Sequence, residues 1–309
     1  MTNCIHKPVL KSEVLAALRP EAGGRYVDGT AGWGGHAEAI LKASSPTGWL
    51  HGFDRDDAAI EAASARLAPF AGRFELRRAN FDQMAETVEA GTCDGVLLDL
   101  GVSSPQLDVG ERGFSFMQDA GLDMRMDRRQ SLTAGGLVND ADVEELTRIF
   151  RELGGEKRAR LFARAIDRER TVRRIETTGQ LAELLERKAP RGGRRAHPAT
   201  KAFMGLRLAV NDEMGSVRRG LPAAMSVLKP GGRLAVITFH SLEDRVVKLW
   251  GRQEERDYEF DGDVDLPELR RPRQPLLKRV NRKAICPGDD ELETNPRARS
   301  AQLRVFEKL

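Results

Sequence analysis

Residues 25–36 read Arg25-Tyr26-Val27-Asp28-Gly29-Thr30-Ala31-Gly32-Trp33-Gly34-Gly35-His36. A short apolar run, a glycine-rich turn and the start of a helical pattern follow one another, which predicts a strand, a loop and a helix. Glycines adopt backbone conformations that a Cβ forbids, and they let the main chain approach a ligand closely. At the carboxyl end of a parallel strand, such a loop is typical of nucleotide-type ligand sites. The stretch therefore predicts the first unit of a doubly wound α/β domain.

The same alternation continues for about a hundred residues. We expect strands at 25–28, 49–54, 74–78 and 95–99, and helices at 35–43, 56–67 and 83–88. Strands that are apolar on both faces and separated by helices indicate a parallel sheet covered on both sides.

The alternation stops after Asp99. A Gly/Ser/Pro/Asp-rich loop runs to about Arg129, and helical apolar spacing then extends over 140–188. A helix at about 200–228, a turn at 229–232 and a strand at 233–238 resume the α/β pattern. We therefore predict one α/β domain formed by 1–106 and 207–309, with a basic, mainly helical domain inserted at 107–206.

The composition is that of an ordinary globular protein. The chain has 309 residues, 40% of them hydrophobic and 31% charged, which suits about two domains. The cysteines Cys4, Cys93 and Cys286 form no C-x-x-C pair, and the five histidines show no ligand spacing. We therefore expect no disulfide framework and no metal site. With neither a leader-like apolar region nor a membrane-length apolar run in the sequence, a cytoplasmic location is expected.

The net charge of +3 is unevenly distributed. Residues 151–207 contain 16 Lys and Arg against 7 Asp and Glu, a net charge of +9, which leaves −6 for the remainder. A second basic cluster near the C-terminus comprises Arg270, Arg271, Arg273, Lys278, Arg279, Arg282 and Lys283. Such asymmetry favours a polyanionic partner, most often nucleic acid. A solvated, arginine-rich helical face is the alternative for such a charge run.

Two aspartates discriminate between candidate ligands of the glycine loop. A dinucleotide would place a doubly negative pyrophosphate beside Asp28, whereas S-adenosylmethionine offers an ammonium and a sulfonium there. Asp28 therefore favours S-adenosylmethionine. Asp54 ends the second strand, where a carboxylate can bind both ribose hydroxyls of either ligand. As an alternative, Asp54 caps the next helix, a role that Asp56 could also fill. Phe81 is by default a core residue, although its ring could line an adenine pocket.

A second candidate site follows the fourth strand. Asp99, Ser103, Ser104, Pro105 and Gln106 lie where a substrate and a cofactor methyl group would meet. Methylation of an exocyclic amine is difficult because the nitrogen lone pair is delocalised into the ring. Acceptors that bind its N–H groups and draw the nitrogen towards sp³ geometry would lower the barrier. A proline-terminated turn after a strand is the structural alternative.

A further motif, His240-Ser241-Leu242-Glu243-Asp244-Arg245, follows the resumed strand. Ser241 and Asp244 are a plausible helix-capping pair, and the position places His240 and Arg245 at the ligand-binding edge.

Taken together, several segments resemble one family in order along the chain. They are Lys7-Pro8-Val9-Leu10, 28–36, 99–108, Arg112-Gly113-Phe114-Ser115-Phe116, Leu122-Asp123-Met124-Arg125-Met126-Asp127, His197-Pro198-Ala199-Thr200, 239–245 and Asn295-Pro296-Arg297. The family is the bacterial 16S ribosomal RNA cytosine-N4 methyltransferases of the RsmH or MraW type. The resemblance implies a Rossmann-like class I methyltransferase domain that transfers methyl from S-adenosylmethionine to N4 of a cytidine in the decoding region of 16S rRNA.

The resemblance also implies roles for individual residues. The cofactor-binding set that it implies is Gly34, Gly35, His36, Asp54, Phe81, Asp99 and Gln106. From the chemistry of the loop we expect Ser103, Ser104 and Pro105, with Asp99, to orient the amine. The helical insert is expected to hold the RNA of the small ribosomal subunit, together with the C-terminal basic segment. The chain departs from the family pattern at Met204-Gly205, where Gln-Ala is usual, and at Thr238, where Ser is usual.

Two other classes of function remain open from the residues alone. A nicotinamide-dependent oxidoreductase could use the same glycine loop, since Gly32-x-Gly34-x-x-Ala37 fits a relaxed dinucleotide fingerprint. A ribosome-assembly factor, whose RNA binding matters more than its chemistry, would explain the basic insert.

Overall fold

The computed structural model describes residues 7–102, 109–190, 196–260 and 264–309. The chain forms two compact units: unit 1 comprises 1–101 and 215–309, and unit 2 comprises 102–214. The sequence pattern places the second boundary at 206/207, which lies within the helix α9 (Thr200–Val210). Phe203, Leu206 and Val210 of this helix pack in the core of unit 2, so the helix belongs to that unit as a whole.

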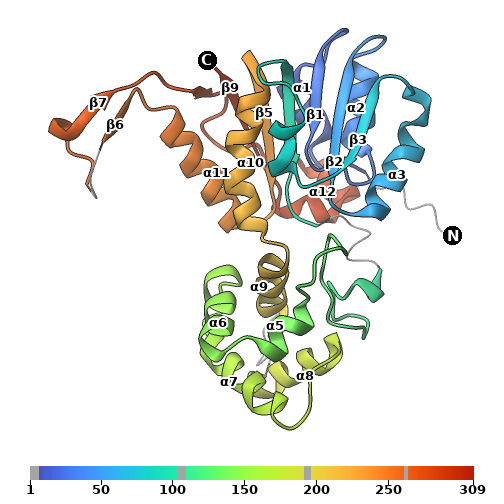
Figure 1. Ribbon diagram of the computed structural model, residues 1–309, viewed down its shortest axis with the longest axis vertical. Helices are drawn as coiled ribbons and strands as arrows, with labels where there is room; N and C mark the ends of the chain where they lie inside the picture. The colour runs from blue at the N-terminus through green and yellow to red at the C-terminus, as the bar shows by residue number, and fades with distance from the viewer. Residues whose placement is uncertain (1–6, 103–108, 191–195, 261–263) are drawn as a thin grey trace. The chain divides into compact units, whose positions relative to one another are not determined.

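Unit 1 is built on a seven-stranded sheet with the strand order β3-β2-β1-β4-β5-β9-β8 (Figure 1). Its strands are β1 (Arg25–Asp28), β2 (Trp49–Asp54), β3 (Phe74–Arg78), β4 (Cys93–Asp99), β5 (Leu228–Thr238), β8 (Leu277–Arg279) and β9 (Gln302–Lys308). β1 to β5 pair in parallel, whereas β9 is antiparallel to β5 and to β8. The strand order reverses between β1 and β4, which is the switch point where ligands bind in such sheets. The predicted Rossmann-like doubly wound fold is confirmed.

Both faces of this sheet are covered by helices. Along β5, Leu234 and Val236 pack with helices α10 and α11, whereas Ala235 and Ile237 pack with helices α1 and α2. This alternation follows from the two-residue period of a strand. The helices of unit 1 are α1 (Lys11–Leu18), α2 (Gly35–Ala43), α3 (Asp57–Leu67), α10 (Glu213–Val227, which begins at the unit boundary), α11 (Ser241–Glu254), α12 (Asp289–Thr294), and the short 3-10 helices η1 (Ala68–Phe70), η2 (Phe81–Glu86), η5 (Pro267–Leu269) and η6 (Pro296–Ser300).

Two helices differ from the sequence prediction. The expected helix at 83–88 is instead the 3-10 helix η2, which begins at Phe81 because Asn80 and Gln83 form a capping box. The single helix expected at 200–228 is wrong: α9 ends at Val210, and α10 begins at Glu213. Asp212 adopts a left-handed φ of 43°, which short polar residues tolerate better than others and which ends the helix.

Unit 2 is helical, as the apolar spacing predicts. Its elements are η3 (Gly110–Arg112), α5 (Ala134–Asp140), α6 (Val143–Arg148), the π-helical turn η4 (Ile149–Leu153), α7 (Ala159–Arg170), α8 (Thr178–Lys188) and α9. Phe150, Phe162 and Leu181 are fully buried at its centre. A Cβ on Gly205 would lie 2.9 Å from the Ile149 carbonyl oxygen. The glycine at this position therefore permits close packing of α9 on η4.

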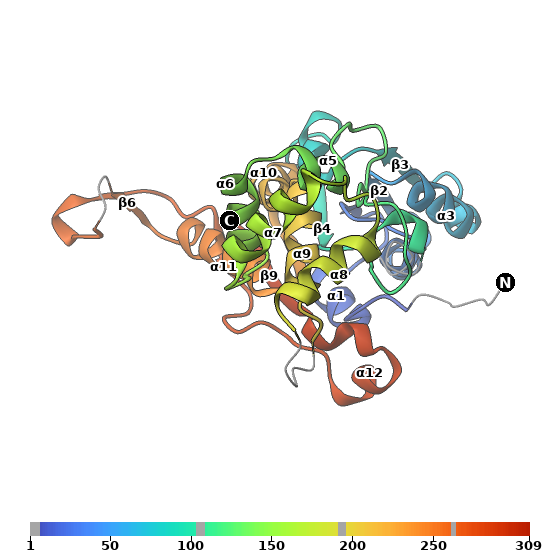
Figure 2. The ribbon, with the colours of Figure 1, turned by 90° about the horizontal axis from the view of Figure 1, so that it is seen from below.

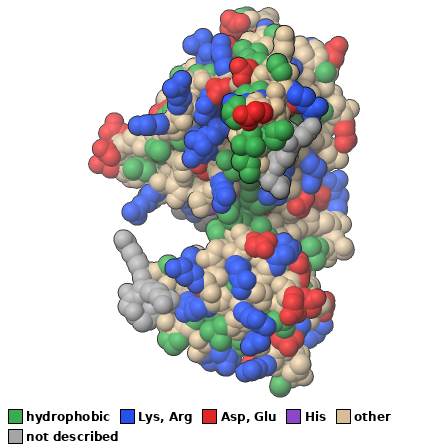
Figure 3. Space-filling view, turned by 90° about the vertical axis from the view of Figure 1, so that its left-hand side faces the viewer, with side chains coloured by type: hydrophobic (Ala, Val, Ile, Leu, Met, Phe, Trp, Pro, Cys, Tyr) green, Lys and Arg blue, Asp and Glu red, His purple; other side chains and the backbone are tan. Residues whose placement is uncertain are grey.

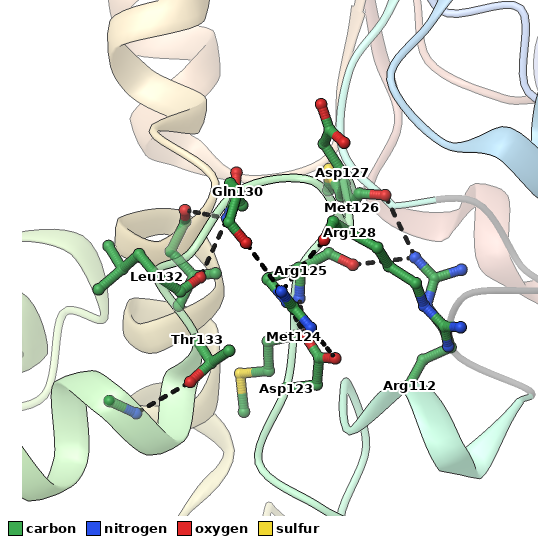
Figure 4. Close-up of polar contacts among 12 residues, drawn as sticks. Arg112, Asp123, Met124, Arg125, Met126, Asp127, Arg128, Gln130, Leu132 and Thr133 are labelled. Carbon is green, nitrogen blue, oxygen red and sulfur yellow. Dashed lines mark hydrogen bonds and ion pairs between the residues drawn. The ribbon is translucent and has the colours of Figure 1, made fainter.

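The Leu122–Asp127 motif forms a braced turn in unit 2 (Figure 4). Arg125 contacts both carboxylate oxygens of Asp123 and donates to the carbonyl oxygens of Arg128 and Gln130. From α9's C-cap, the Asn211 side chain accepts from Met126 N at 2.8 Å and donates to the Met124 carbonyl at 2.8 Å. The motif thus has a structural role, which is to fasten an irregular segment to the end of α9.

The basic cluster near the C-terminus is largely paired with carboxylates. Arg270 contacts Asp265 at 2.7 Å, and Lys278 contacts Glu307 at 2.7 Å. Arg273 and Arg279 pair with Glu254 and Glu255. Part of this segment forms the hairpin β6 (Tyr258–Phe260) and β7 (Arg270–Pro272), which extends away from the sheet (Figures 1 and 2). The positive charge that the sequence suggests here is therefore substantially offset.

None of the helices within the described ranges combines the length and the apolarity needed to cross a membrane.

Candidate functional site

Three aspartates end three neighbouring strands of unit 1. Asp28 ends β1, Asp54 ends β2 and Asp99 ends β4, and these strands are adjacent in the order β2-β1-β4. Because all three strands run parallel, their carboxyl ends lie at one edge of the sheet. The structure therefore brings together the carboxylates that the sequence singles out, at the switch point of the sheet.

The glycine loop is fixed to this edge by its own backbone. Ala31 N donates to the Phe53 carbonyl at 2.8 Å, and Gly34 N donates to the Ala31 carbonyl at 2.7 Å. Gly32 and Gly34 have φ values of 50° and 75°, which favour glycine. Gly34 is the N-cap of α2 and, having no side chain, makes no side-chain capping hydrogen bond.

Thr30 joins the loop to the end of β4. Its hydroxyl accepts a hydrogen bond from Asp99 N at 2.7 Å, while its own N–H donates to Asp28 Oδ1 at 3.1 Å. From the first turn of α2, the Nε2 atom of His36 lies 3.6 Å from Asp99 Oδ2. Asp28, His36 and Asp99 therefore form one polar cluster, with Gly34 and Gly35 directly before His36.

Asp54 is bound by the glycine loop rather than by the helix that follows it. Its Oδ2 accepts from Gly32 N at 2.9 Å, and its Oδ1 accepts from Asp56 N at 2.9 Å. Asp56 is the N-cap of α3 and accepts from Ala58 N at 3.2 Å. Of the two predicted roles, helix capping therefore falls to Asp56, and Asp54 stays at the ligand-binding edge.

The carboxylates at this edge resist ionisation together. Burial raises the pKa of Asp28 to about 7, and the nearby charge of Asp54 contributes in the same direction. Desolvation also raises the pKa of Asp99 well above its ordinary range, and the charges of Asp28 and Glu243 raise it further. Desolvation raises the pKa of Asp54 as well. A cationic ligand at this edge would relieve the repulsion, whereas a phosphate would increase it.

Glu243 is a carboxylate of this cluster that the sequence does not single out. It is buried in the first turn of α11, where its Oε2 accepts from Phe239 N at 3.0 Å. His240 is the N-cap, since its Nδ1 accepts from Glu243 N while its Nε2 lies 2.9 Å from Glu243 Oε1. The predicted Ser241–Asp244 cap is therefore wrong. An acidic residue three positions after His240 is the signal that could have indicated this capping box.

Phe81 is 7% exposed and packs in a core cluster of unit 1 with residues of β4 and α10. A Cβ on Gly220 of α10 would lie 2.2 Å from its ring, so the glycine makes room for that ring. The default prediction of a core position is confirmed. The predicted substrate-orienting residues Ser103, Ser104 and Pro105, and the predicted cofactor residue Gln106, lie outside the described residues.

The segment formed by residues 7–10, called the strap below, supports the glycine loop. The Pro8 ring lies 3.0 Å from where a Cβ on Gly35 would be. Leu10 N donates to Glu291 Oε1 at 2.8 Å, which ties this strap to α12. Lys7 and Asn295 add a further contact, because Asn295 Nδ2 donates to the Lys7 carbonyl at 3.3 Å. The terminal motifs Lys7-Pro8 and Asn295-Pro296 thus meet beside the loop.

Over the described residues, no group of three or more His, Cys, Asp or Glu side chains is arranged to hold a metal ion. Among the described residues, the chemistry available at the edge comes from backbone N–H groups, carboxylates, the Thr30 hydroxyl and the imidazoles of His36 and His240. Asp28 Oδ2 and Asp99 Oδ1 are buried and accept no hydrogen bond from any residue whose position is described. Both atoms are thus acceptors suited to a donor-rich, positively charged ligand.

The comparison with family models matches residues 3–309 to the MraW methylase family. The chain belongs to this family. Two relatives named ribosomal RNA small subunit methyltransferase H are each 49% identical and cover 98% of this chain, one from Symbiobacterium thermophilum and one from Geobacter sulfurreducens. The alignments cover 96% and 99% of those proteins.

A solved structure of a putative rRNA methylase from Clostridium thermocellum aligns over 98% of this chain and 99% of its own, at 13% identity and a TM-score of 0.47. Because the MraW family is a methylase family, the nicotinamide-dependent alternative is set aside.

Proposed function

We propose that this chain transfers a methyl group from S-adenosylmethionine to the N4 amino group of a cytidine in the decoding region of 16S rRNA. The observation that carries the proposal is the acidic edge formed by Asp28, Asp54 and Asp99 around a glycine loop. S-adenosylmethionine supplies a methyl group activated by a sulfonium, and its ammonium and sulfonium both complement this negative charge.

The residues of the edge fit distinct parts of that cofactor. Gly34, Gly35 and His36 hold the methionine end, where helix α2 begins. Asp54 holds the ribose, since its two oxygens are already oriented by Gly32 N and Asp56 N. The unused acceptor on Asp99 binds a donor of the cofactor.

Two further residues complete the proposed cofactor set. Phe81 borders the adenine, and its core packing would hold it rigid. Gln106 is assigned by the family resemblance.

The segment Ser103, Ser104 and Pro105 orients the acceptor amine. The nitrogen lone pair of cytidine is delocalised into the ring, so acceptors on its N–H groups and alignment with the methyl carbon lower the barrier. The amine hydrogen becomes acidic only after methyl transfer, and no strong base is required. We therefore assign no general base.

Direct transfer is favoured over covalent attack on the ring by a thiolate. The buried Cys93 lies in β4, and burial raises the pKa of its thiol, which disfavours the nucleophilic form. Cys286 lies in the C-terminal segment, far in sequence from the glycine loop and the β4 end.

The proposed substrate is the RNA of the small ribosomal subunit in the cytoplasm. Two observations support it: the names of the curated relatives and the net charge of +9 between residues 151 and 207. Unit 2 is the proposed RNA-holding part, because it contains that basic stretch.

Methyl transfer tests the proposal directly. The protein is incubated with S-adenosylmethionine carrying a labelled methyl group, together with isolated small subunits or naked 16S rRNA, and the labelled nucleoside is identified by mass spectrometry. N4-methylcytidine at one site is the expected product. A label on another nucleoside, or none with either RNA while the cofactor is bound, would contradict the proposal.

A further inference from the structure

Helix α7 carries a row of arginines along one exposed face. Arg160, Arg164 and Arg168 are spaced four residues apart and are all exposed. Four residues of an α-helix rise by about 6 Å, so the three side chains follow one another along a single stripe. The opposite face of the helix is occupied, since Phe162 and Ile166 are buried in the core of unit 2.

Unlike these three, several exposed arginines of unit 2 are paired with carboxylates of described residues. Arg148 pairs with Glu145, and Arg174 pairs with Asp140. Where the chain is described, no carboxylate forms an ion pair with any of the three stripe arginines. Like charges four residues apart destabilise a helix, so the stripe is unfavourable for folding unless an anion binds it.

The stripe leads into a pocket between α7 and α8. The pocket has a volume of about 370 Å³ and is lined by Ala165, Arg168, Glu169, Leu184, Arg187 and Lys188. Its single carboxylate, on Glu169, lies 3.7 Å from Arg187. Figures 1 and 2 both show α7 beside α8, and Figure 3 shows Lys and Arg side chains spread over one face of this unit. The pocket therefore combines a concave shape with a net positive charge.

We propose that the α7 stripe and this pocket form a track for the phosphodiester backbone of RNA, with one phosphate seated between Arg168 and Lys188. The inference rests on the proposed function, because it names the surface of unit 2 that holds the RNA substrate. Guanidinium groups bind phosphate oxygens through paired N–H donors. An anionic membrane surface fits less well, because the apolar face of α7 is used in the core and is not available to lipid.

The test measures how salt weakens RNA binding to the full chain. The probe is a fluorescein-labelled oligouridylate, which presents backbone phosphates and no specific sequence. The variant Arg164→Gln/Arg168→Gln removes two stripe charges, and the matched control Arg148→Gln/Arg174→Gln removes two exposed but ion-paired charges of the same unit. The stripe variant is expected to flatten the slope of log affinity against log salt by about 1.4, since each single-strand phosphate contact contributes about 0.7.

The control variant is expected to change that slope by less than half as much. Lys188→Gln tests the pocket and is expected to flatten the slope by about 0.7. Equal slopes for the wild type and the stripe variant, or an equal change in the control, would overturn the proposal. Binding to phosphatidylserine vesicles in place of the oligouridylate would also overturn it.

A second readout separates this inference from the proposed reaction. In methyl transfer to small subunits, the stripe variant is expected to raise KM with little change in kcat, while its calorimetric affinity for S-adenosylmethionine stays that of the wild type. If neither the wild type nor the variants transfer methyl but the salt slopes differ as expected, the reaction is refuted and the RNA track stands. If transfer occurs and the slopes are equal, the track is refuted and the reaction stands.

Discussion

Lowering the pH from about 8 to about 6 is expected to weaken the binding of S-adenosylmethionine at least tenfold. Burial raises the pKa of Asp28 to about 7, so this carboxyl group is mostly ionised at the higher pH and mostly protonated at the lower one. Only the ionised form attracts the positive charges of the cofactor. The dissociation constant therefore rises as the pH falls through 7, and the raised pKa of Asp99 acts in the same direction.

The magnitude follows from the ionised fraction of Asp28. A group with a pKa near 7 is about 91% ionised at pH 8 and about 9% at pH 6, a ratio of about ten before Asp99 is considered. Because the pKa of Asp28 is raised from 3.8, ionising its carboxyl group in the ligand-free protein costs about 4 kcal/mol more than ionising an exposed carboxyl group. A bound cation offsets this cost.

Isothermal calorimetry across this pH range measures both the affinity and the protons released. Near pH 6, binding is expected to release about one proton from Asp28. The control is Asp28→Asn, which keeps the acceptor for Thr30 N and removes the charge. Its affinity is expected to be weaker at pH 8 and to depend less on pH. A wild-type affinity that does not change between pH 6 and pH 8, or the same pH dependence in Asp28→Asn, would show that ionised Asp28 does not attract the cofactor.

Three further predictions concern the cap of α11, the Asn211 side chain in unit 2 and the N-terminal segment beside the glycine loop. His240→Ala should lower the free energy of unfolding by about 1 kcal/mol through loss of the α11 cap, whereas Ser241→Ala should change it by less than about 0.5 kcal/mol. A larger loss for Ser241→Ala than for His240→Ala in denaturant titrations would contradict the assigned cap. Asn211→Ala removes a side chain that satisfies Met126 N and the Met124 carbonyl, and a loss of about 3 kcal/mol is expected; an unchanged unfolding curve would refute the brace. Glu291→Ala removes the acceptor of Leu10 N and should raise the Kd for S-adenosylmethionine several-fold, whereas Glu293→Ala on the same helix should leave the Kd unchanged. Equal effects of the two substitutions on the Kd would show that the strap does not support the glycine loop.

The sequence predicted the sheet and its aspartates because those features depend on local patterns. The strands β1 to β3 begin and end where the apolar runs do, and Asp28, Asp54 and Asp99 end their strands as expected. Parallel pairing then places their carboxylates at one edge without further information.

Other features depend on contacts between distant residues, which a sequence pattern does not contain. At the end of α9, Asn211 forms hydrogen bonds to a turn more than 80 residues earlier in the chain, next to Asp212, whose left-handed φ ends the helix. The buried Glu243 becomes part of the acidic cluster only when α11 packs behind β5. The C-terminal arginines look like a basic patch in the sequence, but Glu254, Glu255 and Asp265 pair with several of them in the folded chain.

The proposed function requires the β4 end and the segment after it to hold the cofactor and to present the amine. Single-turnover methyl transfer from S-adenosylmethionine to small subunits tests it most directly, with the wild type compared with Asp99→Ala, Ser104→Ala and Gln106→Ala. Circular dichroism establishes that each variant is folded. The wild type is expected to form N4-methylcytidine, and each folded variant is expected to react at least about tenfold more slowly, a loss of about 1.4 kcal/mol of transition-state stabilisation. Full single-turnover rates in all three folded variants would contradict this requirement.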